Sequence, residues 1–491
     1  MMSPGESMLV RPLSVMAEMG MRNKAIRGLF FKMAKKRLYE EVVVKNVTGR
    51  PRRVQEEKYL MIRNMLNSIE KMFREHRLSH EALNGVMKIL VEEVLINDIG
   101  RRKKAFREER RGSPGFLTIS PTRACNLCCR GCYAASSSKE SLQLDYQVFS
   151  RIIEEKTRFW NSHFCVISGG EPFLYQDGVK GLLDIAGEHA DNYFLVYTNG
   201  TLIDREMASE LARLGNITPA ISVEGMERET DDRRGRGVYQ KILAAMRHLR
   251  EFGIPFGISV TATRHNADLV VSDRFVDFYF EKQGVAYAWI FQYLPIGRQF
   301  DVDLMVTPQQ RMNMYRREQY LIREKGHFIA DFWNSGPVSN GCISAGRDGG
   351  YLYIDWKGDV MPCVFFPYTV DNIVEAYEQG LDLNSVLNSP FFKSIRRWQR
   401  DYGFLKPSHE VGNLIVPCPY RDHYDSARQV TIGCQARPAD RAAAEAIGDD
   451  IYCQKMTEYG RNVSDLFGDI WNRLYIDPER TSHKTERIGR I

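Results

Sequence analysis

Residues 120 to 134 read Ser-Pro-Thr-Arg-Ala-Cys-Asn-Leu-Cys-Cys-Arg-Gly-Cys-Tyr-Ala. Three of these cysteines, Cys125, Cys129 and Cys132, are spaced C-x₃-C-x₂-C. A short loop with this spacing can place three thiolates around three corners of a cubane iron–sulfur cluster, because cysteine thiolates are the usual ligands of such clusters. Three protein ligands leave the fourth metal position open, as a catalytic metal site requires. A zinc knuckle or a group of buried thiols is the alternative to a cluster.

The composition sets the class of protein around this loop. The chain has 491 residues, of which 43% are hydrophobic and 26% charged, and its net charge is +6. This composition excludes a collagen, a coiled-coil rod and a wholly disordered chain, and the length predicts about two to four domains. No apolar run reaches the roughly 18 residues of a membrane-spanning helix, and charges interrupt the apolar runs near the N-terminus. We therefore expect a cytoplasmic protein, in which the ten cysteines are metal ligands or redox groups rather than disulfides.

The N-terminal segment, residues 1–112, is predicted to be a basic helical subdomain. It carries 25 Lys and Arg against 14 Asp and Glu, and its apolar residues recur at helical spacing. Two interpretations stay open: a helical unit with a solvated basic face, or a basic amphipathic surface that binds a membrane or an acidic partner. In the second case the protein would be cytoplasmic and peripheral to the membrane. No nucleic-acid-binding motif accompanies the charge, so we expect no nucleic acid partner.

From residue 115 onward, short β-branched or aromatic runs alternate with helical stretches. This alternation predicts βα units with right-handed crossovers and a parallel sheet, whose buried strands are apolar on both faces. The predicted fold class is therefore α/β, with a partial (β/α)₆ TIM-like barrel that binds ligands at the C-terminal ends of its strands. The expected strands are 116–120, 164–168, 193–198, 218–223, 256–262 and 286–292, and the expected helices lie near 144–159, 176–189, 202–213, 238–252 and 268–281.

The cysteine loop resembles that of the radical S-adenosylmethionine (SAM) superfamily. An Arg-Ala-Cys-Asn-Leu run at the first cysteine and an aromatic residue after the third, here Tyr133, are typical of that superfamily. The second expected strand ends in Gly169-Gly170-Glu171-Pro172, which resembles the Gly-Gly-Glu-Pro segment of the same enzymes. The resemblance implies that this segment hydrogen-bonds the amino group of SAM. Cys128 departs from the pattern as an extra thiol, and we interpret it as a non-ligand.

Later strand ends add expected contacts to SAM. The third strand ends at Thr198-Asn199, the fourth carries Ser222 and Glu224, and Arg234 follows just before a Gly-Arg-Gly run. The resemblance implies that Ser222 and Glu224 bind the ribose hydroxyls, although many relatives have Asp at the second position. It implies that Arg234 binds the SAM carboxylate, which suits the planar guanidinium fork. The expected cofactor contacts are Tyr133, Gly169, Gly170, Glu171, Thr198, Asn199, Ser222, Glu224 and Arg234.

A second group of cysteines begins at residue 342. The stretch from Cys342 to Cys363, with Gly358 in a predicted hairpin, is similar to the opening of the SPASM and twitch extensions, which bind auxiliary iron–sulfur clusters. The dense C-x₂-C-x₅-C-x₃-C run of a full SPASM domain is missing, so we expect one auxiliary [4Fe-4S] cluster rather than two. Its expected ligands are Cys342, Cys363 and Cys418, with Cys434 or Cys453 as the fourth, while Cys165 is expected in the barrel core.

The resemblance divides the chain and implies an enzyme. The expected units are the helical subdomain 1–112, the radical SAM barrel 113–305, a SPASM/twitch-like α+β extension 306–425 and a helical tail 426–491. A reduced [4Fe-4S] cluster on the cysteine loop would cleave SAM to a 5′-deoxyadenosyl radical that abstracts hydrogen from a substrate carbon, with electrons from a reductant such as flavodoxin or ferredoxin.

Three functions follow from the resemblance and the residues. Most relatives with such an extension modify peptides or proteins, so peptide or protein maturation is the expected function. Radical modification of a lipid or another hydrophobic metabolite at a membrane surface is the alternative. A non-catalytic iron–sulfur electron carrier is a remote third interpretation, because it leaves Gly169–Pro172 and Arg234 without a role.

Overall fold

The computed structural model describes residues 24–109 and 112–477 of the chain. Its centre is a sheet of seven parallel strands, each paired with the next one in the sequence. The strands are β1 (Leu117–Ile119), β2 (Phe164–Ile167), β5 (Tyr193–Thr198), β6 (Ile217–Val223), β7 (Gly257–Ala262), β8 (Ala288–Gln292) and β9 (Ile329–Asp331). The helices between them are α6 (Tyr146–Trp160), α7 (Leu182–Glu188), α8 (Arg205–Leu214), α9 (Glu227–Arg234), α10 (Val238–Glu251), α11 (Ala267–Val270), α12 (Asp273–Val276) and α13 (Pro308–Arg323).

The predicted α/β fold class with a partial barrel is confirmed. Its six expected strands form β1, β2, β5, β6, β7 and β8, and β9 adds a seventh parallel strand that the sequence pattern did not predict. The expected helix 176–189 begins later than predicted. A turn at Gly178, whose φ is +60°, first joins the short strands β3 (Gln176–Asp177) and β4 (Lys180–Gly181) in a hairpin. Glycine adopts this backbone conformation at no steric cost.

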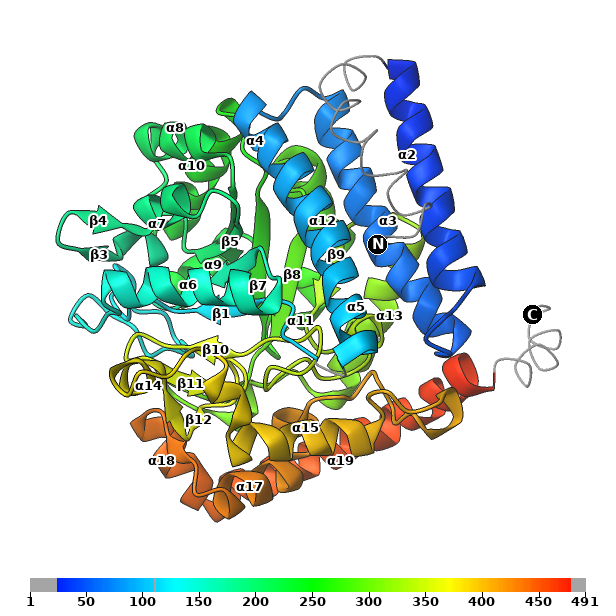
Figure 1. Cartoon of the computed structure of the whole chain (residues 1–491), viewed down its shortest axis with the longest axis vertical. Helices are drawn as coiled ribbons and strands as arrows, with labels where there is room; N and C mark the ends of the chain where they lie inside the picture. Colours follow the sequence, from blue (N-terminus) through cyan, green and yellow to red (C-terminus); the bar gives the residue numbers. More distant parts are fainter. Residues whose placement is uncertain (1–23, 110–111, 478–491) are drawn as a thin grey trace.

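The C-terminal extension continues the central sheet. Strand β10 (Tyr353–Ile354) pairs in parallel with β1, and β11 (Asp359–Met361) and β13 (Asp371–Asn372) follow it antiparallel, at the sheet edge opposite β9. The sheet therefore includes strands from both the expected barrel and the expected extension. The remaining elements lie beneath the barrel in Figure 1: α14 (Ile373–Glu378), α15 (Pro390–Tyr402), α16 (Pro419–Asp422), α17 (Tyr424–Gly433), α18 (Arg441–Gly448), α19 (Asp450–Trp471), and the pair β12 (Tyr368–Thr369) and β14 (Arg437–Pro438).

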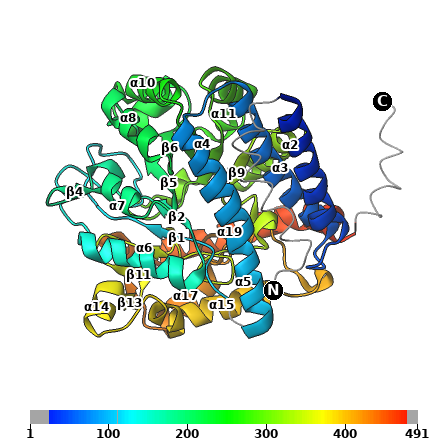
Figure 2. The ribbon, with the colours of Figure 1, turned by 45° about the horizontal axis from the view of Figure 1, so that its top comes forward.

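The N-terminal helices gather on one side of the barrel (Figure 1 and Figure 2). They are α2 (Lys24–Tyr39), α3 (Arg52–Arg74), α4 (His80–Asn84), the π-helical segment η2 (Gly85–Asp98) and α5 (Ile99–Glu109). Helix α3 lies across the starts of β8 and β9. Its Ser68 Oγ donates to the carbonyl of Ala286 at 2.6 Å, and Asn64 Nδ2 donates to the carbonyl of His327 at 2.9 Å. Among the described residues, no helix is both long and apolar enough to cross a membrane.

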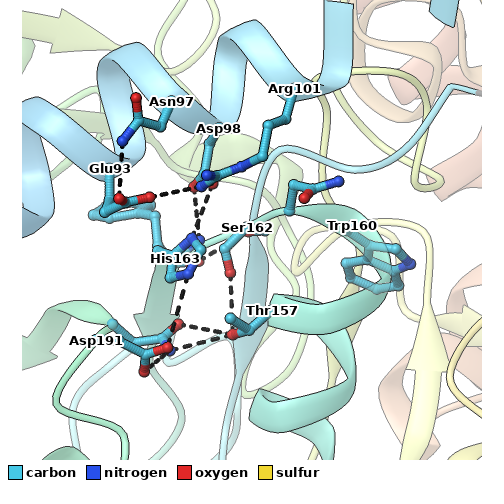
Figure 3. Close-up of polar contacts among 12 residues, drawn as sticks. Glu93, Asn97, Asp98, Arg101, Thr157, Trp160, Ser162, His163 and Asp191 are labelled. Carbon is cyan, nitrogen blue, oxygen red and sulfur yellow. Dashed lines mark hydrogen bonds and ion pairs between the residues drawn. The ribbon is translucent and has the colours of Figure 1, made fainter. Parts of the chain in front are cut away.

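A polar cluster ties η2 to the start of β2, as Figure 3 shows. The buried Asp98 carboxylate accepts the backbone N–H of His163 at 2.8 Å, and its other oxygen lies 2.9 Å from His163 Nδ1. Arg101 donates to both Asp98 and Glu93, at 2.9 and 2.6 Å. These acidic groups and the histidine lie close enough together to hold a metal ion, but the Arg101 guanidinium already supplies them with a positive charge. We interpret the cluster as a structural link between the helical unit and the barrel.

Candidate active site and auxiliary metal centre

The cysteine loop follows β1 and faces the cavity at the C-terminal ends of the barrel strands. Cys125, Cys129 and Cys132 all line this cavity, whose volume is about 450 Å³, whereas Cys128 is exposed to solvent and does not line it. Burial raises the pKa of the Cys125 thiol to about 12. A metal bound at this position would deprotonate such a thiol outright. The residues present therefore fit a three-thiolate iron–sulfur site, and the structure separates Cys128 from it.

The loop is held in place mainly by backbone contacts with the turn after β2. Gly170 N–H donates to the carbonyl of Thr122 at 2.9 Å, and Glu171 N–H donates to that of Ala124 at 2.8 Å. A Cβ on Gly170 would overlap the Ala124 carbonyl, so only glycine fits there. Gly169 has a φ of +114°, and its N–H donates to Tyr133 Oη at 2.8 Å. The Gly-Gly turn thus positions the loop while its two glycines also line the cavity.

Glu171 is buried behind the cavity rather than on its wall. Its carboxylate oxygens accept from Thr198 Oγ1 at 2.7 Å and from Asn199 N–H at 2.8 Å, which joins the ends of β2 and β5. Burial raises the pKa of Glu171 to about 7. Both oxygens already have protein partners, so Glu171 acts in this structure as a positioning residue for Thr198 and Asn199, which line the cavity. A direct contact between Glu171 and SAM stays a prediction.

The end of β6 and helix α9 supply a charged group beside the loop. Ser222 lines the cavity and lies 3.1 Å from Ser259 through their hydroxyl oxygens. Arg233 and Arg234 both donate to the same oxygen of the buried Glu224, at 2.5 Å from each guanidinium. The other oxygen, Glu224 Oε2, is buried and has no hydrogen-bond partner among the described residues. Arg233 and Arg234 line the cavity and fit a ligand that carries a carboxylate group, whereas Glu224 does not line it, so its expected contact with the ribose hydroxyls stays a prediction.

Two positioning arginines were not singled out by the sequence analysis. Arg298 donates to the carbonyls of Cys129 at 3.0 Å and Ser136 at 2.6 Å, and its own N–H donates to that of Cys132 at 2.9 Å. Arg233 donates to the carbonyl of Arg130 at 3.1 Å. Both side chains therefore fix the backbone of the cysteine loop. The sequence signals were weak: Arg298 directly follows a Pro-x-Gly turn, and Arg233 precedes Arg234.

Cys342, Cys363 and Cys418 come together in a second, smaller pocket. They lie after the short helix η6 (Gly336–Ser339), after β11 and at the start of α16. Burial raises the pKa of the Cys418 thiol to about 12. Tyr351 Oη lies 2.9 Å from Cys363 Sγ and lines both this pocket and the main cavity. Three converging thiols fit an auxiliary iron–sulfur centre.

The structure does not bring the two expected candidates for a fourth thiol into this pocket. Cys434 lies at the end of α17, where its Sγ is 3.7 Å from Ser394 Oγ on α15. Cys453 lies on α19, 3.9 Å from Tyr424 Oη. Helix α17 alone spans ten residues, or about 15 Å, and carries Cys434 away from the start of the helix. Cys165 is fully buried in the core on β2.

Eleven aromatic side chains are among the residues that line the main cavity. Among the described residues that line it, Asp331 is the one acidic side chain, and it accepts from Gln292 Nε2 at 2.7 Å. Met61 of α3 also lines the cavity, so the N-terminal helical unit supplies part of its wall. The aromatic residues are Phe116, Tyr133, Phe164, Tyr197, Trp289, Phe291, Tyr293, Phe328, Phe332, Tyr351 and Phe365.

Two family models match the chain. The Radical SAM superfamily model matches residues 119–268, and the model of the SPASM iron–sulfur cluster-binding domain matches residues 342–407. These ranges contain the cysteine loop with its glycine turn, and two of the three auxiliary cysteines. The third auxiliary cysteine, Cys418, lies outside the second range.

The chain is similar in sequence to several curated proteins, of which three are described. The mycofactocin maturase MftC of Mycobacterium tuberculosis is 28% identical over 333 residues, which cover 66% of this chain and 79% of the relative. The AdoMet-dependent heme synthase of Methanosarcina barkeri is 24% identical over 371 residues, covering 70% and 96%. The sporulation killing factor maturation protein SkfB of Bacillus subtilis is 28% identical over 279 residues, covering 53% and 63%.

Proposed function

We propose, from the premise that the chain belongs to the radical SAM superfamily and carries a SPASM extension, that it matures a peptide or protein by abstracting hydrogen from one of its carbon atoms. The bound [4Fe-4S] cluster and SAM supply the chemistry, a 5′-deoxyadenosyl radical formed after one-electron reduction. We infer that Cys125, Cys129 and Cys132 hold the cluster. A flavodoxin or ferredoxin is the proposed physiological reductant.

The cavity supports this chemistry through shielding and orientation. A carbon radical reacts with many hydrogen donors, so the enclosed site must exclude water and hold one substrate carbon in reach. Aromatic rings supply rigid apolar walls for that purpose. Thr198, Asn199 and Ser222 supply hydrogen-bonding groups on the cavity wall close to the cysteine loop. The cysteine loop opening on this cavity is the observation that carries the proposed function.

The choice of substrate rests on the relatives. MftC and SkfB are both named for maturation, which supports a peptide or protein substrate. The heme synthase relative and the aromatic cavity wall support a second candidate, a flat or extended hydrophobic metabolite.

The first experiment tests the radical chemistry. Anaerobically reconstituted protein, given SAM and dithionite, should release 5′-deoxyadenosine, and Cys129→Ala should release none. Cys128→Ala is the matched control and should keep the yield. Loss of the product in Cys128→Ala together with its retention in Cys129→Ala would overturn the ligand assignment.

The second experiment separates the substrate classes. Candidate precursor peptides with deuterium on carbon and deuterated tetrapyrroles are each incubated with the enzyme, and 5′-deoxyadenosine is examined by mass spectrometry for deuterium. Transfer from a peptide supports maturation, whereas transfer from the tetrapyrrole alone would replace it with the second candidate.

We further propose that the outer face of α2 attaches to an anionic membrane surface. Leu29 and Met33 are 59% and 61% exposed there, one helical turn apart, with the exposed lysines Lys32 and Lys36 on the same face. Val47, just beyond the helix, is 85% exposed. Exposed apolar side chains next to lysines are typical of helices that lie in the headgroup region of anionic membranes.

A vesicle flotation assay tests this attachment. The full chain should float with phosphatidylglycerol vesicles more than with phosphatidylcholine vesicles, and the double variant Leu29→Asp, Met33→Asp should lose the difference. Val179→Asp is the matched control, because Val179 is 94% exposed in the β3–β4 turn, outside the N-terminal helices. Equal flotation of wild type and the double variant would contradict a membrane contact through α2 and favour an acidic protein partner.

A further inference from the structure

Three positively charged side chains gather beside the segment that leads to Cys342. Arg50 lies just before α3 and Lys58 lies on it, whereas Arg347 follows Cys342 in the extension. Both arginines are buried, and Lys58 is half-buried. The N-terminal helical unit therefore brings two positive charges to the part of the extension that holds a cysteine of the auxiliary pocket.

Two of these side chains bind the Cys342 segment directly. Lys58 Nζ donates to Asn340 Oδ1 at 2.7 Å, two residues before Cys342. The Arg347 guanidinium donates to the carbonyl of Cys342 itself and, at 2.6 Å, to the carbonyl of Ser339. Neither side chain lines the auxiliary pocket, so their charges lie behind the cysteine rather than in the space between the three thiols.

The chain supplies little negative charge to balance these cations. Among the described residues, each hydrogen-bond acceptor of Arg50, Lys58 and Arg347 is an uncharged oxygen, and none of the three forms an ion pair with a carboxylate. Asp348 favours the charged form of Arg347, but the charges that act on Lys58 are those of other cations. Burial, followed by the charges of Arg50 and Arg347, lowers the pKa of Lys58 to about 7. Buried positive charge without a partner is costly, so this place in the fold is suited to an anion.

The auxiliary cluster can provide the missing negative charge. Cys342, Cys363 and Cys418 each contribute a negatively charged thiolate when they hold a metal cluster. Net charge is one of the factors that set the reduction potential of an iron–sulfur cluster. An added electron makes the cluster more negative, so nearby cations favour its reduced form. The cations behind Cys342 should therefore make the cluster easier to reduce.

We propose that Arg50, Lys58 and Arg347 compensate the negative charge of the auxiliary cluster and raise the potential at which it accepts an electron. The N-terminal helical unit, which lies outside the residues matched by the two family models, thereby sets a redox property of a centre whose proposed ligands all belong to the extension. This role requires the auxiliary cluster but no particular substrate, and it is separate from the proposed maturation of a peptide.

Lys58 is the residue to change, because the two arginines also hold backbone carbonyls in place. The full chain carrying Cys125→Ala, Cys129→Ala and Cys132→Ala retains only the auxiliary cluster, whose midpoint potential is measured by anaerobic redox titration with electron paramagnetic resonance (EPR). Lys58→Met removes the charge. At the midpoint potential of the parent triple variant, the ratio of reduced to oxidised cluster should then fall about tenfold, a shift of about 59 mV for a one-electron couple. The matched control is Lys71→Met, 13 residues farther along α3 or about 20 Å away, which should leave the potential unchanged.

Two further variants separate the charge of Lys58 from its contact with Asn340. Lys58→Gln keeps a hydrogen-bond donor without the charge and should lower the potential as Lys58→Met does, whereas Lys58→Arg keeps the charge and should retain the parent potential. Iron content and circular dichroism identify the variants that fold and bind the cluster. An unchanged potential in Lys58→Met, a parent potential in Lys58→Gln, or a lowered potential in Lys58→Arg would each overturn the proposal. These measurements need no substrate, so a failure of the peptide-maturation proposal would leave their result unaffected.

Discussion

The two proposed metal sites each present three cysteines, but the protein builds them in different ways. The first set lies within one loop of eight residues, 125–132, held between strand ends of the barrel. The second set comes from three separate places in the chain, Cys342, Cys363 and Cys418. The geometry of the first site is therefore set mainly by a local turn and its backbone contacts. The geometry of the second depends on how the whole extension packs.

The supporting groups differ in the same way. Behind the cysteine loop lies the buried carboxyl of Glu171, which accepts hydrogen bonds from the end of β5. Behind Cys418 lies a fully buried ion cluster, in which Asp422 pairs with Arg311 at 2.7 Å and with Arg421 at 3.0 Å. The first site is supported by the glycine turn and by the guanidinium groups of Arg298 and Arg233, which donate to loop carbonyls, and the second by an ion cluster that is fully buried in the core.

The largest difference between the sites should be their effect on SAM cleavage. Cys129→Ala removes a proposed ligand of the first cluster, so 5′-deoxyadenosine formation should fall below detection. Cys363→Ala removes a proposed ligand of the auxiliary centre and should lower the iron content while 5′-deoxyadenosine still forms, because the SAM site is intact. The two variants are compared by iron analysis and product chromatography. Loss of SAM cleavage in Cys363→Ala, with the first cluster still present by EPR, would show that the sites do not act separately.

A second prediction concerns the buried charges of the extension. Burial alone would raise the pKa of the Asp422 carboxyl, but Arg311 and Arg421 hold this pKa well below its usual range. Asp422→Asn leaves two buried guanidinium groups without their counter-charge, so the free energy of unfolding should fall by about 3–5 kcal/mol. Cys418 N–H also donates to Asp422, at 3.2 Å, which links the buried charges to the auxiliary pocket. In the Asp422→Asn variant the auxiliary cluster should therefore be lost at a lower urea concentration than the first cluster.

Urea unfolding and iron analysis check this prediction. The control is Asp303→Asn, because Asp303 forms an exposed pair with Lys455, and its loss should leave the free energy of unfolding close to that of the wild type. Equal effects of the two substitutions would show that the buried charges around Asp422 do not support the extension more than an exposed ion pair does.

A third prediction tests the close backbone approach at the first site. Gly170→Ala places a Cβ against the Ala124 carbonyl, where only backbone could move, and should cost about 3 kcal/mol and reduce loading of the first cluster. Gly187→Ala on α7 is the control. Its Cβ would have ordinary contact with Leu214, and alanine is favoured over glycine in a helix by about 0.5–1 kcal/mol. Unchanged cluster loading in Gly170→Ala would show that the turn does not position the loop.

The same contrast explains what the sequence could predict. The cysteine loop and the Gly169–Pro172 turn can be predicted from the sequence, because the groups that form each of them are close together along the chain. The resemblance predicts Cys342, Cys363 and Cys418 as ligands of the auxiliary centre. The position of Cys434, which lies beside α15 and outside the auxiliary pocket, depends on how α17 packs and cannot be predicted from the sequence. Strand β9 has three residues and ends in the charged Asp331, so its apolar run is too short to stand out in the sequence. The contacts of Arg298 with loop carbonyls join segments more than 150 residues apart, which no local pattern reveals.

The aromatic side chains that line the main cavity also could not be predicted from the sequence. Its rings come from strands on several sides of the barrel and from the extension, and Met61 comes from the N-terminal unit. In the sequence each of these residues has the appearance of ordinary core. Only the folded structure shows that they face a shared cavity.

The smallest expected effect is a difference in how stability depends on pH, which distinguishes the carboxyl of Glu171 from that of Asp422. Because Glu171 has a pKa of about 7 in the folded protein and an ordinary value of 4.5 when unfolded, the folded state binds its proton more tightly. Its contribution to stability is complete below about pH 4.5 and is lost as the pH rises through 7. Between pH 5 and pH 7 the free energy of unfolding of the cluster-free protein should therefore fall by about 2 kcal/mol more in wild type than in Glu171→Gln. The contribution of Asp422 to stability depends on pH with the opposite sign, since its lowered pKa gives a contribution that is lost only in acid.

Urea titrations at the two pH values, with a substitution of the exposed Glu206, Glu206→Gln, as the control, measure the difference. Parallel pH dependences in wild type and Glu171→Gln would mean that Glu171 is already ionised at pH 5, and that its carboxylate is a buried charge like that of Asp422.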